Sequence, residues 1–149
     1  MYDCEFYYLG GKAEKEEGEE LVKKFPLVHN FASKTSFTET AKVLKQCDLL
    51  ITNDSGIMHL GDLLQKKMVV LFGATIVSKN GPYFSKDYRI VRSPCVCAPC
   101  QYHWSFHTCS DYKCMRAISI ERVVKEVQSL LEGEENESID LLSSNIAAN

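Results

Sequence analysis

Short apolar runs that suit buried strands alternate with segments of helical character along most of this chain. The clearest run, Met68–Phe72, is continuously apolar and is stopped by Gly73. Leu49–Thr52 is a second such run, and continuous apolar runs of this length are typical of parallel strands buried on both faces. The alternation predicts an α/β fold, namely a three-layer, Rossmann-like open parallel sheet with helices on both faces.

Local signals place the helices between these strands. Ser36 and Glu39 have the spacing of a capping box, which predicts a helix start. Ser119 is a candidate N-cap for an amphipathic helix near the end of the chain, and Pro26 is expected to stop the first helix. The expected strands are Glu5–Leu9, Leu27–Asn30, Leu49–Thr52, Met68–Phe72 and Arg89–Val91, and the expected helices are 12–24, 36–47, 57–64 and 120–131.

The length of 149 residues is sufficient to bury a core without disulfides. Residues 1–131 are expected to form one Rossmann-like domain that contains a cysteine-rich loop at 94–115, followed by an acidic, flexible tail at 132–149. The net charge of −3 is too small to suggest binding to nucleic acid. No segment approaches the roughly 20 apolar residues that cross a bilayer, and no secretory signal is expected.

Small and polar residues follow the expected strands at the edge of the sheet where ligands bind in this type of fold. Asp54, Ser55 and Gly56 stand at a helix start, directly after the Leu49–Thr52 region. They are either a plain N-cap or a diphosphate site formed by the helix N-terminus and the Gly56 amide. His59 follows within about one turn and can face the same ligand, although a lone histidine on a helix is more often structural.

Two further segments are candidates for the same crevice. Gly73 and Thr75 follow the next strand, and they are either a strand-ending turn or a lining of backbone amides and one hydroxyl. Glu14, Glu16 and Glu17 are either a solvated helix face or a source of a carboxylate for ribose hydroxyls, a role that acidic residues have in doubly wound folds.

The chain has seven cysteines, most of them in one short segment. Because no export signal is expected, a metal site or reduced thiols are favoured over disulfides. Two short pairs of thiolates suit tetrahedral zinc, and the candidate ligands are Cys97, Cys100, Cys109 and Cys114. The gap between the two pairs is short for a zinc ribbon. Three further residues can compete as ligands: Cys95, His103 and His107. The alternative is that these cysteines bind no metal and only shape a loop.

Four segments occur in a fixed order: GGKAEKEE, SKTSFTETAKVLKQCDLLITNDSGIMHL, VVLFGAT and CAPCQYHWSFHTCSDYKCM. Together they resemble the C-terminal half of bacterial heptosyltransferases, glycosyltransferases that build the lipopolysaccharide inner core from ADP-heptose. The resemblance covers about residues 5–131. It implies a GT-B fold, in which two Rossmann-like halves face a cleft and the C-terminal half binds the nucleotide sugar.

The resemblance also implies roles for individual residues. The family's donor-binding motif corresponds to Asp54, Ser55, Gly56 and His59. Thr35 corresponds to a threonine near the adenine, and Glu16 to the glutamate that binds the ribose. Gly73 and Thr75 correspond to a second glycine-threonine turn in the cleft. Because the loop before the glutamate varies in length, Glu14 and Glu17 are alternatives to Glu16.

The expected partners are an ADP-sugar donor and a lipopolysaccharide core acceptor, the latter bound by the N-terminal half. The resemblance implies a cytoplasmic protein, peripheral at the inner membrane at full length, and transfer that requires no cofactor. The catalytic base is expected on the N-terminal half, so no catalytic residue is expected here and the chain alone is expected to transfer no sugar. The alternatives are a non-enzymatic nucleotide-binding or metal-knuckle interaction module, and self-association through an apolar face.

Overall fold

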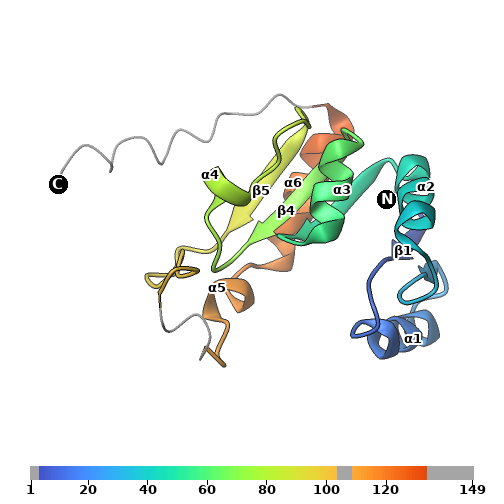
Figure 1. Cartoon of the computed structure of the whole chain (residues 1–149), viewed down its shortest axis with the longest axis horizontal. Coiled ribbons are helices and arrows are strands. Elements are labelled where there is room, and N and C mark those ends of the chain that lie inside the picture. Colours follow the sequence, from blue (N-terminus) through green and yellow to red (C-terminus); the bar gives the residue numbers. More distant parts are fainter. Residues whose placement is uncertain (1–3, 104–108, 134–149) are drawn as a thin grey trace.

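The structure, a computed structural model, describes residues 4–103 and 109–133. Strands and helices alternate along these residues, as Figure 1 shows. The elements are β1 (Phe6–Tyr8), α1 (Lys15–Lys24), β2 (Val28–Asn30), α2 (Phe37–Gln46), β3 (Leu49–Asn53), α3 (Gly56–Leu63), β4 (Lys67–Phe72), α4 (Val77–Asn80), β5 (Tyr88–Arg92), α5 (Lys113–Arg116) and α6 (Ile120–Glu132).

The strands pair in parallel, but the sheet has two parts. β1 pairs with β2, with Tyr7 opposite His29. β3, β4 and β5 form the second part, with Val69 opposite both Ile51 and Arg89. Among the described residues, no ladder joins β1 to β3. The predicted α/β fold with parallel strands is confirmed, and in the described residues these strands form two separately paired parts.

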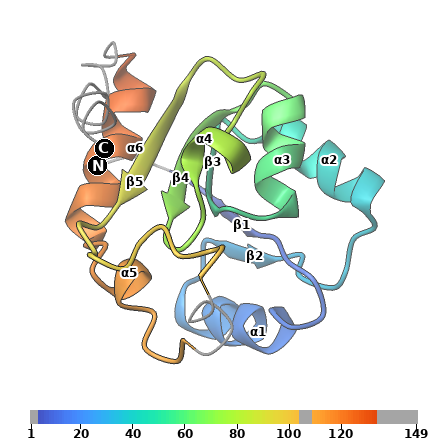
Figure 2. The same ribbon diagram turned by 60° about the vertical axis from the view of Figure 1, so that its left-hand side comes forward.

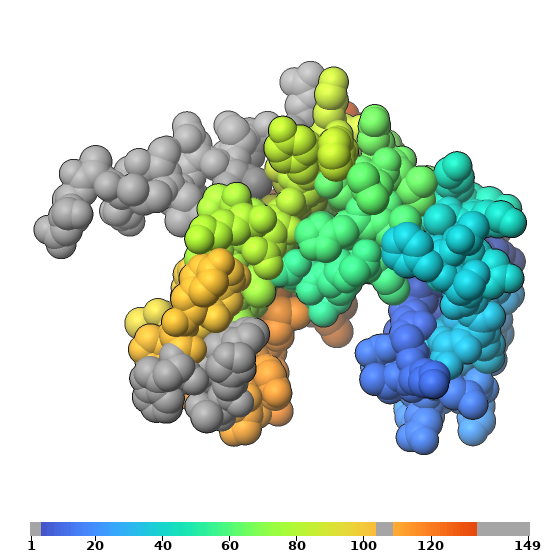
Figure 3. All heavy atoms as spheres, in the orientation of Figure 1, coloured from blue at the N-terminus to red at the C-terminus, as the bar shows by residue number. Residues whose placement is uncertain are grey.

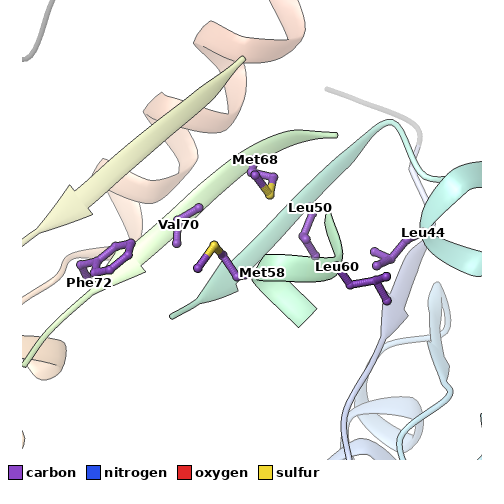
Figure 4. Close-up of a cluster of buried hydrophobic side chains, with 7 residues drawn as sticks. All are labelled: Leu44, Leu50, Met58, Leu60, Met68, Val70 and Phe72. Atoms are coloured by element: carbon purple, nitrogen blue, oxygen red, sulfur yellow. The ribbon is translucent and has the colours of Figure 1, made fainter. Parts of the chain in front are cut away.

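The core lies on both faces of β4, because its side chains alternate between them. Met68, Val70 and Phe72 point to the side of α3 and join the buried cluster drawn in Figure 4. Val69 points to the other face, where it packs with Leu130 of α6. Figure 2 shows α3 and α6 on opposite sides of the three-stranded part. This part therefore has the three layers that the sequence predicts.

The helix starts follow the local signals. The Ser36 hydroxyl accepts a hydrogen bond from the Glu39 backbone, and the Glu39 carboxylate accepts one from the Ser36 backbone, so the predicted capping box is confirmed. Ser119 caps α6 through a bond from the Arg122 backbone. The short helices α4 and α5 were not expected, because four residues are too few to show a period.

Helix α6 ends at Glu132, and Gly133 follows in the left-handed conformation with φ of 75°. The rest of the predicted acidic tail lies outside the described residues, as does His107. In the part of the chain that the structure describes, no helix has both the length and the apolar character that crossing a membrane requires.

Candidate functional site

A pocket of about 930 Å³ opens at the carboxyl ends of β1 and β3. Figure 3 shows the surface hollowed between the N-terminal part of the molecule, in blue, and the segment that leads into α6, in orange. The polar part of the lining comes from the strand ends and the helices that follow: Gly10, Gly11, Glu14, Glu17, Thr35, Asn53, Ser55 and Gly56. The pocket thus lies at the edge of the sheet that the topology rule favours for ligands.

The N-terminus of α3 forms one wall of this pocket. Ser55 occupies the N-cap position but makes no side-chain bond to the helix, and its Oγ lies 3.3 Å from Thr52 Oγ1. A Cβ atom at Gly56 would meet no atom within 4 Å. The first turn of α3 is therefore open toward the pocket, with its backbone N–H groups and the positive end of the helix dipole available to an anion.

Asp54 and His59 lie beside that helix start. The Asp54 carboxylate accepts a hydrogen bond of 3.0 Å from Asn80 Nδ2 on α4. Its other oxygen is 3.9 Å from His59 Nε2, and only 12% of the Asp54 side chain is exposed, against 56% for His59. The structure thus brings these predicted residues together beside the pocket, although neither Asp54 nor His59 belongs to its lining. It also adds Asn80, which the sequence gives no reason to associate with Asp54 because the two lie 26 residues apart.

Two glutamates face the pocket from the other side. Glu14 accepts a hydrogen bond of 2.7 Å from the Gly11 backbone, and Glu17 accepts one of 2.6 Å from the Tyr8 hydroxyl. Burial and the Glu17 carboxylate raise the pKa of Tyr8 to about 12, so this hydroxyl stays protonated at neutral pH. Glu16 is exposed and does not line the pocket. The geometry therefore favours Glu14 and Glu17 over Glu16 as the ribose-binding glutamate.

Thr35 lines the pocket on the same side as the glutamates. Its Oγ1 lies 2.9 Å from the Thr40 hydroxyl, and it also lies 3.5 Å from the carbonyl oxygen of Phe31, to which it donates. These contacts hold a hydroxyl beside the start of α2. The predicted placement of Thr35 next to the ligand crevice therefore agrees with the geometry.

The turn after β4 packs against other residues of the protein and does not line the pocket. A Cβ atom at Gly73 would lie 2.8 Å from Met115 Sδ and 3.0 Å from Cys114 Sγ, so Gly73 admits these sulfur atoms. Thr75 is half-buried and is also outside the pocket lining. The pocket lining includes neither residue of this predicted pair, but it does include Met115, which packs on Gly73.

The cysteine-rich loop is attached to the same turn. The Ala74 carbonyl accepts hydrogen bonds from the Cys100 and Gln101 backbones, and the Gln101 side chain accepts one of 2.7 Å from the Ile76 backbone. Sequence reasoning missed Gln101, since a lone glutamine inside a loop gives no signal. These bonds fix the loop against the segment that carries Asn80.

The seven cysteines are free thiols in the structure. Cys95 and Cys97 are in contact, with 3.3 Å between their sulfur atoms, and this hydrogen bond raises the pKa of the Cys97 thiol. Burial raises the pKa of Cys114. Within residues 4–103 and 109–133, no three histidine, cysteine or acidic side chains are placed to hold a metal ion. As placed, Cys97, Cys100, Cys109 and Cys114 do not form the predicted tetrahedral set, and zinc stays a prediction.

Comparison with known proteins gives a consistent result. The family model described as glycosyltransferase family 9 (heptosyltransferase) matches residues 3–109. Lipooligosaccharide heptosyltransferase 2 of Campylobacter jejuni is 33% identical over 127 residues, which are 81% of this chain and 39% of that protein. The chain thus spans about two fifths of the length of these curated relatives.

Two solved structures share the fold. The glycosyl transferase family 9 protein from Veillonella parvula superposes with a TM-score of 0.71 at 25% identity, over 87% of this chain and 37% of its own. The Escherichia coli ADP-heptose lipopolysaccharide heptosyltransferase II gives a TM-score of 0.67 at 23% identity, over 89% of this chain and 38% of its own.

Proposed function

Because the chain belongs to glycosyltransferase family 9, the heptosyltransferase family, we propose that it is the nucleotide-sugar-binding portion of an enzyme that transfers heptose to the lipopolysaccharide inner core. The observation that carries this proposal is the pocket at the carboxyl ends of β1 and β3. One wall is the open N-terminus of α3, and the other carries the carboxylates of Glu14 and Glu17.

The two walls suit two neighbouring parts of an ADP-sugar, the diphosphate and the ribose. The backbone N–H groups after Ser55, together with the space left by Gly56, fit the negative diphosphate. Carboxylates are acceptors for ribose hydroxyls, and Glu14 and Glu17, which line the pocket, are the proposed acceptors. Thr35 lies on the same side, where the adenine and ribose would be.

Asp54 and His59 are proposed to position the donor. The bond from Asn80 and the proximity of His59 orient the Asp54 carboxylate. A fixed carboxylate beside a helix N-terminus can accept hydrogen bonds from sugar hydroxyls, while His59 can donate to a phosphate oxygen. Gly73, which admits the sulfur atoms of Met115 and Cys114, is proposed to act through this packing rather than by touching the ligand.

The acceptor and the base are proposed to lie outside this chain. An inverting transfer requires a base that deprotonates the acceptor hydroxyl and a geometry that holds both substrates. The proposed acceptor is the lipopolysaccharide core, the proposed location is the cytoplasm, at the inner membrane for the full-length protein, and transfer would need no cofactor. The chain by itself is therefore expected to bind the donor but not to transfer heptose.

Calorimetry with ADP tests the binding proposal directly. We expect weak binding by the full chain, because only part of the ligand surface would be provided, and we expect Asp54→Ala to abolish it. Asp48→Ala is the matched control, since Asp48 is exposed and lies at the amino end of β3, away from the pocket. The absence of heat at millimolar ADP, or an equal loss in both variants, would contradict the proposal.

A transfer assay separates this proposal from its alternatives. Incubation of the chain with ADP-heptose and a core acceptor is expected to give no product, while the chain still binds ADP. Genuine turnover by the chain alone would show that the base is not external. Coding sequence for an acceptor domain immediately upstream would disfavour the alternative of a non-enzymatic nucleotide-binding or metal-knuckle module.

A further inference from the structure

Cys95 and Cys97 bring two thiols into direct contact on the loop that follows β5. Their sulfur atoms lie 3.3 Å apart. Residues two positions apart in an extended segment share a face but are separated by about 7 Å along the backbone. Here the backbone bends, because the Ala98 N–H donates a hydrogen bond of 3.0 Å to the Cys95 carbonyl, as in a β-turn. The turn therefore brings the two thiols together.

The pair opens on a cavity of about 620 Å³ between this turn and α5 (Figure 2). The turn contributes Cys95, Val96 and Cys97 to the lining, and α5 contributes Lys113 and Arg116. Cys97 and Val96 are exposed. A small molecule can therefore reach the thiols from solvent without any rearrangement of the fold.

The wall that α5 forms is positively charged. Lys113 and Arg116 stand beside the thiols, and Asp111 is their acidic neighbour, 3.0 Å from Lys113 Nζ and 3.9 Å from Arg116 Nη1. One carboxylate against two cations leaves the wall with a net positive charge. Such a wall attracts a small molecule that carries carboxylates.

Other cysteines are engaged elsewhere. Cys114 is buried, and its sulfur lies where a Cβ atom at Gly73 would come within 3.0 Å. Cys47 is half-buried on α2, where its thiol donates to the Val43 carbonyl. The Cys100 backbone is bonded to Ala74. The contact thus selects Cys95 as the partner of Cys97, although the spacing of Cys97 and Cys100 is the more familiar one for a thiol pair.

We propose that Cys95 and Cys97 form a thiol–disulfide exchange site for anionic disulfides of low molecular weight. One protein thiolate attacks a sulfur atom of the small disulfide, which breaks its S–S bond, forms a mixed disulfide and expels one small thiolate. The second protein thiolate then attacks the protein sulfur of the mixed disulfide. This step forms the Cys95–Cys97 bond and expels the second small thiolate.

The exchange is balanced without any further reactant. Two protein thiols are oxidised, one small disulfide is reduced to two thiols, and the two protons pass through solvent from the protein thiols to the released thiolates. Because the two protein sulfur atoms are already in contact, the second step is intramolecular and is favoured over a lasting mixed disulfide. The proposal does not depend on which ligand occupies the pocket at β1 and β3.

The proposed exchange competes with the predicted zinc site for Cys97, because an ion bound to this thiol would withhold it from exchange. The full chain is therefore reduced, freed of reductant, assayed for zinc and then incubated with glutathione disulfide. Mass spectrometry is expected to show the loss of two hydrogen atoms, with fragment spectra that locate a bond between Cys95 and Cys97. Dithiothreitol is expected to reverse it.

Cysteine variants identify the partners. In Cys95→Ser, the remaining Cys97 is expected to gain one glutathione, since no second thiol is in contact to release it. Cys4→Ser and Cys100→Ser are the matched controls, and both are expected to retain the Cys95–Cys97 bond. A bond between Cys97 and Cys100, glutathione held stably on the wild-type pair, or no reaction of the pair, with or without about one bound zinc per chain, would each overturn the proposal.

A charge variant tests the class of disulfide. At low ionic strength, Lys113→Gln is expected to slow the reaction with glutathione disulfide, which is net negative, by about twofold or more. The same variant is expected not to slow the reaction with cystamine, a positively charged disulfide. An equal slowing of both reactions would overturn the proposed preference for anionic disulfides.

Discussion

Asp62 is a buried acidic residue whose carboxylate is held by three backbone N–H groups. It is 4% exposed, and its carboxylate accepts hydrogen bonds from the Tyr83, Phe84 and Ser85 backbones at 2.8–3.0 Å. Burial by itself would raise the pKa of Asp62, but the three N–H donors outweigh it and hold the pKa below its usual value. One side chain of α3 thereby anchors the loop between α4 and β5.

Replacement of Asp62 by asparagine is expected to lower the free energy of unfolding at pH 7 by about 1–3 kcal/mol. Since the folded pKa is depressed, the carboxylate contributes stability above its unfolded pKa of about 3.9 and loses this contribution as the pH falls through the folded value. The difference between wild type and variant in urea titrations should therefore shrink below about pH 4. Asp111→Asn, at an exposed position, is the control and should change the free energy of unfolding little. A loss of stability in Asp62→Asn that does not vary with pH would refute this account.

Substitution of two glycines of α3 by alanine is expected to affect different properties, stability at one position and ADP binding at the other. A Cβ at Gly61 would lie 2.5 Å from Leu50 Cδ2 in the core, whereas one at Gly56 meets no atom within 4 Å. Gly61→Ala should cost about 1–2 kcal/mol of stability, because overpacking exceeds the gain in helix propensity. Gly56→Ala should leave stability within about 0.5 kcal/mol but weaken ADP binding by about tenfold. Thermal unfolding and calorimetry on both variants check the pair, and unchanged ADP affinity in Gly56→Ala would remove Gly56 from the site.

At the scale of elements, the helices begin where local chemistry specifies. The capping box at α2 involves only residues within three positions of each other, and it could be predicted for that reason. The strands β3 and β4 could likewise be predicted from their continuous apolar character. The sequence did not reveal the bond between Asn80 and Asp54 or the packing of Met115 on Gly73, since each joins residues that only the tertiary fold brings together.

Removal of the Ser36 cap is expected to destabilise the protein by about 1 kcal/mol, because one backbone donor at the start of α2 loses its partner. Chemical denaturation of Ser36→Ala should show this as a lower midpoint with an unchanged slope. Ser78→Ala, at an exposed position on α4 whose hydroxyl caps no helix, is the control. An equal effect of both changes would mean that the cap contributes nothing specific.

At the scale of the whole molecule, the cysteine-rich loop raises the question of metal content. The thiols as placed are not arranged for zinc in the described residues. The spacing of Cys97, Cys100, Cys109 and Cys114 nevertheless predicts a site, because a bound ion can draw such ligands together. Elemental analysis of protein purified without chelator decides the matter: close to one zinc per chain confirms the prediction, and less than about 0.2 rejects it.

The break in the sheet has a consequence for cooperativity. The β1–α1–β2 unit shares no ladder with β3–β5 in the described residues, so the two can open as separate folding units with different free energies. Glu14 and Glu17 belong to one unit, and Ser55 and Gly56 to the other. A nucleotide that contacts both would act as a non-covalent cross-link and make them unfold together. Amide hydrogen exchange in β1 and β2 should therefore be fast without ADP. As ADP fills the pocket, it should slow until its rate approaches that of β4.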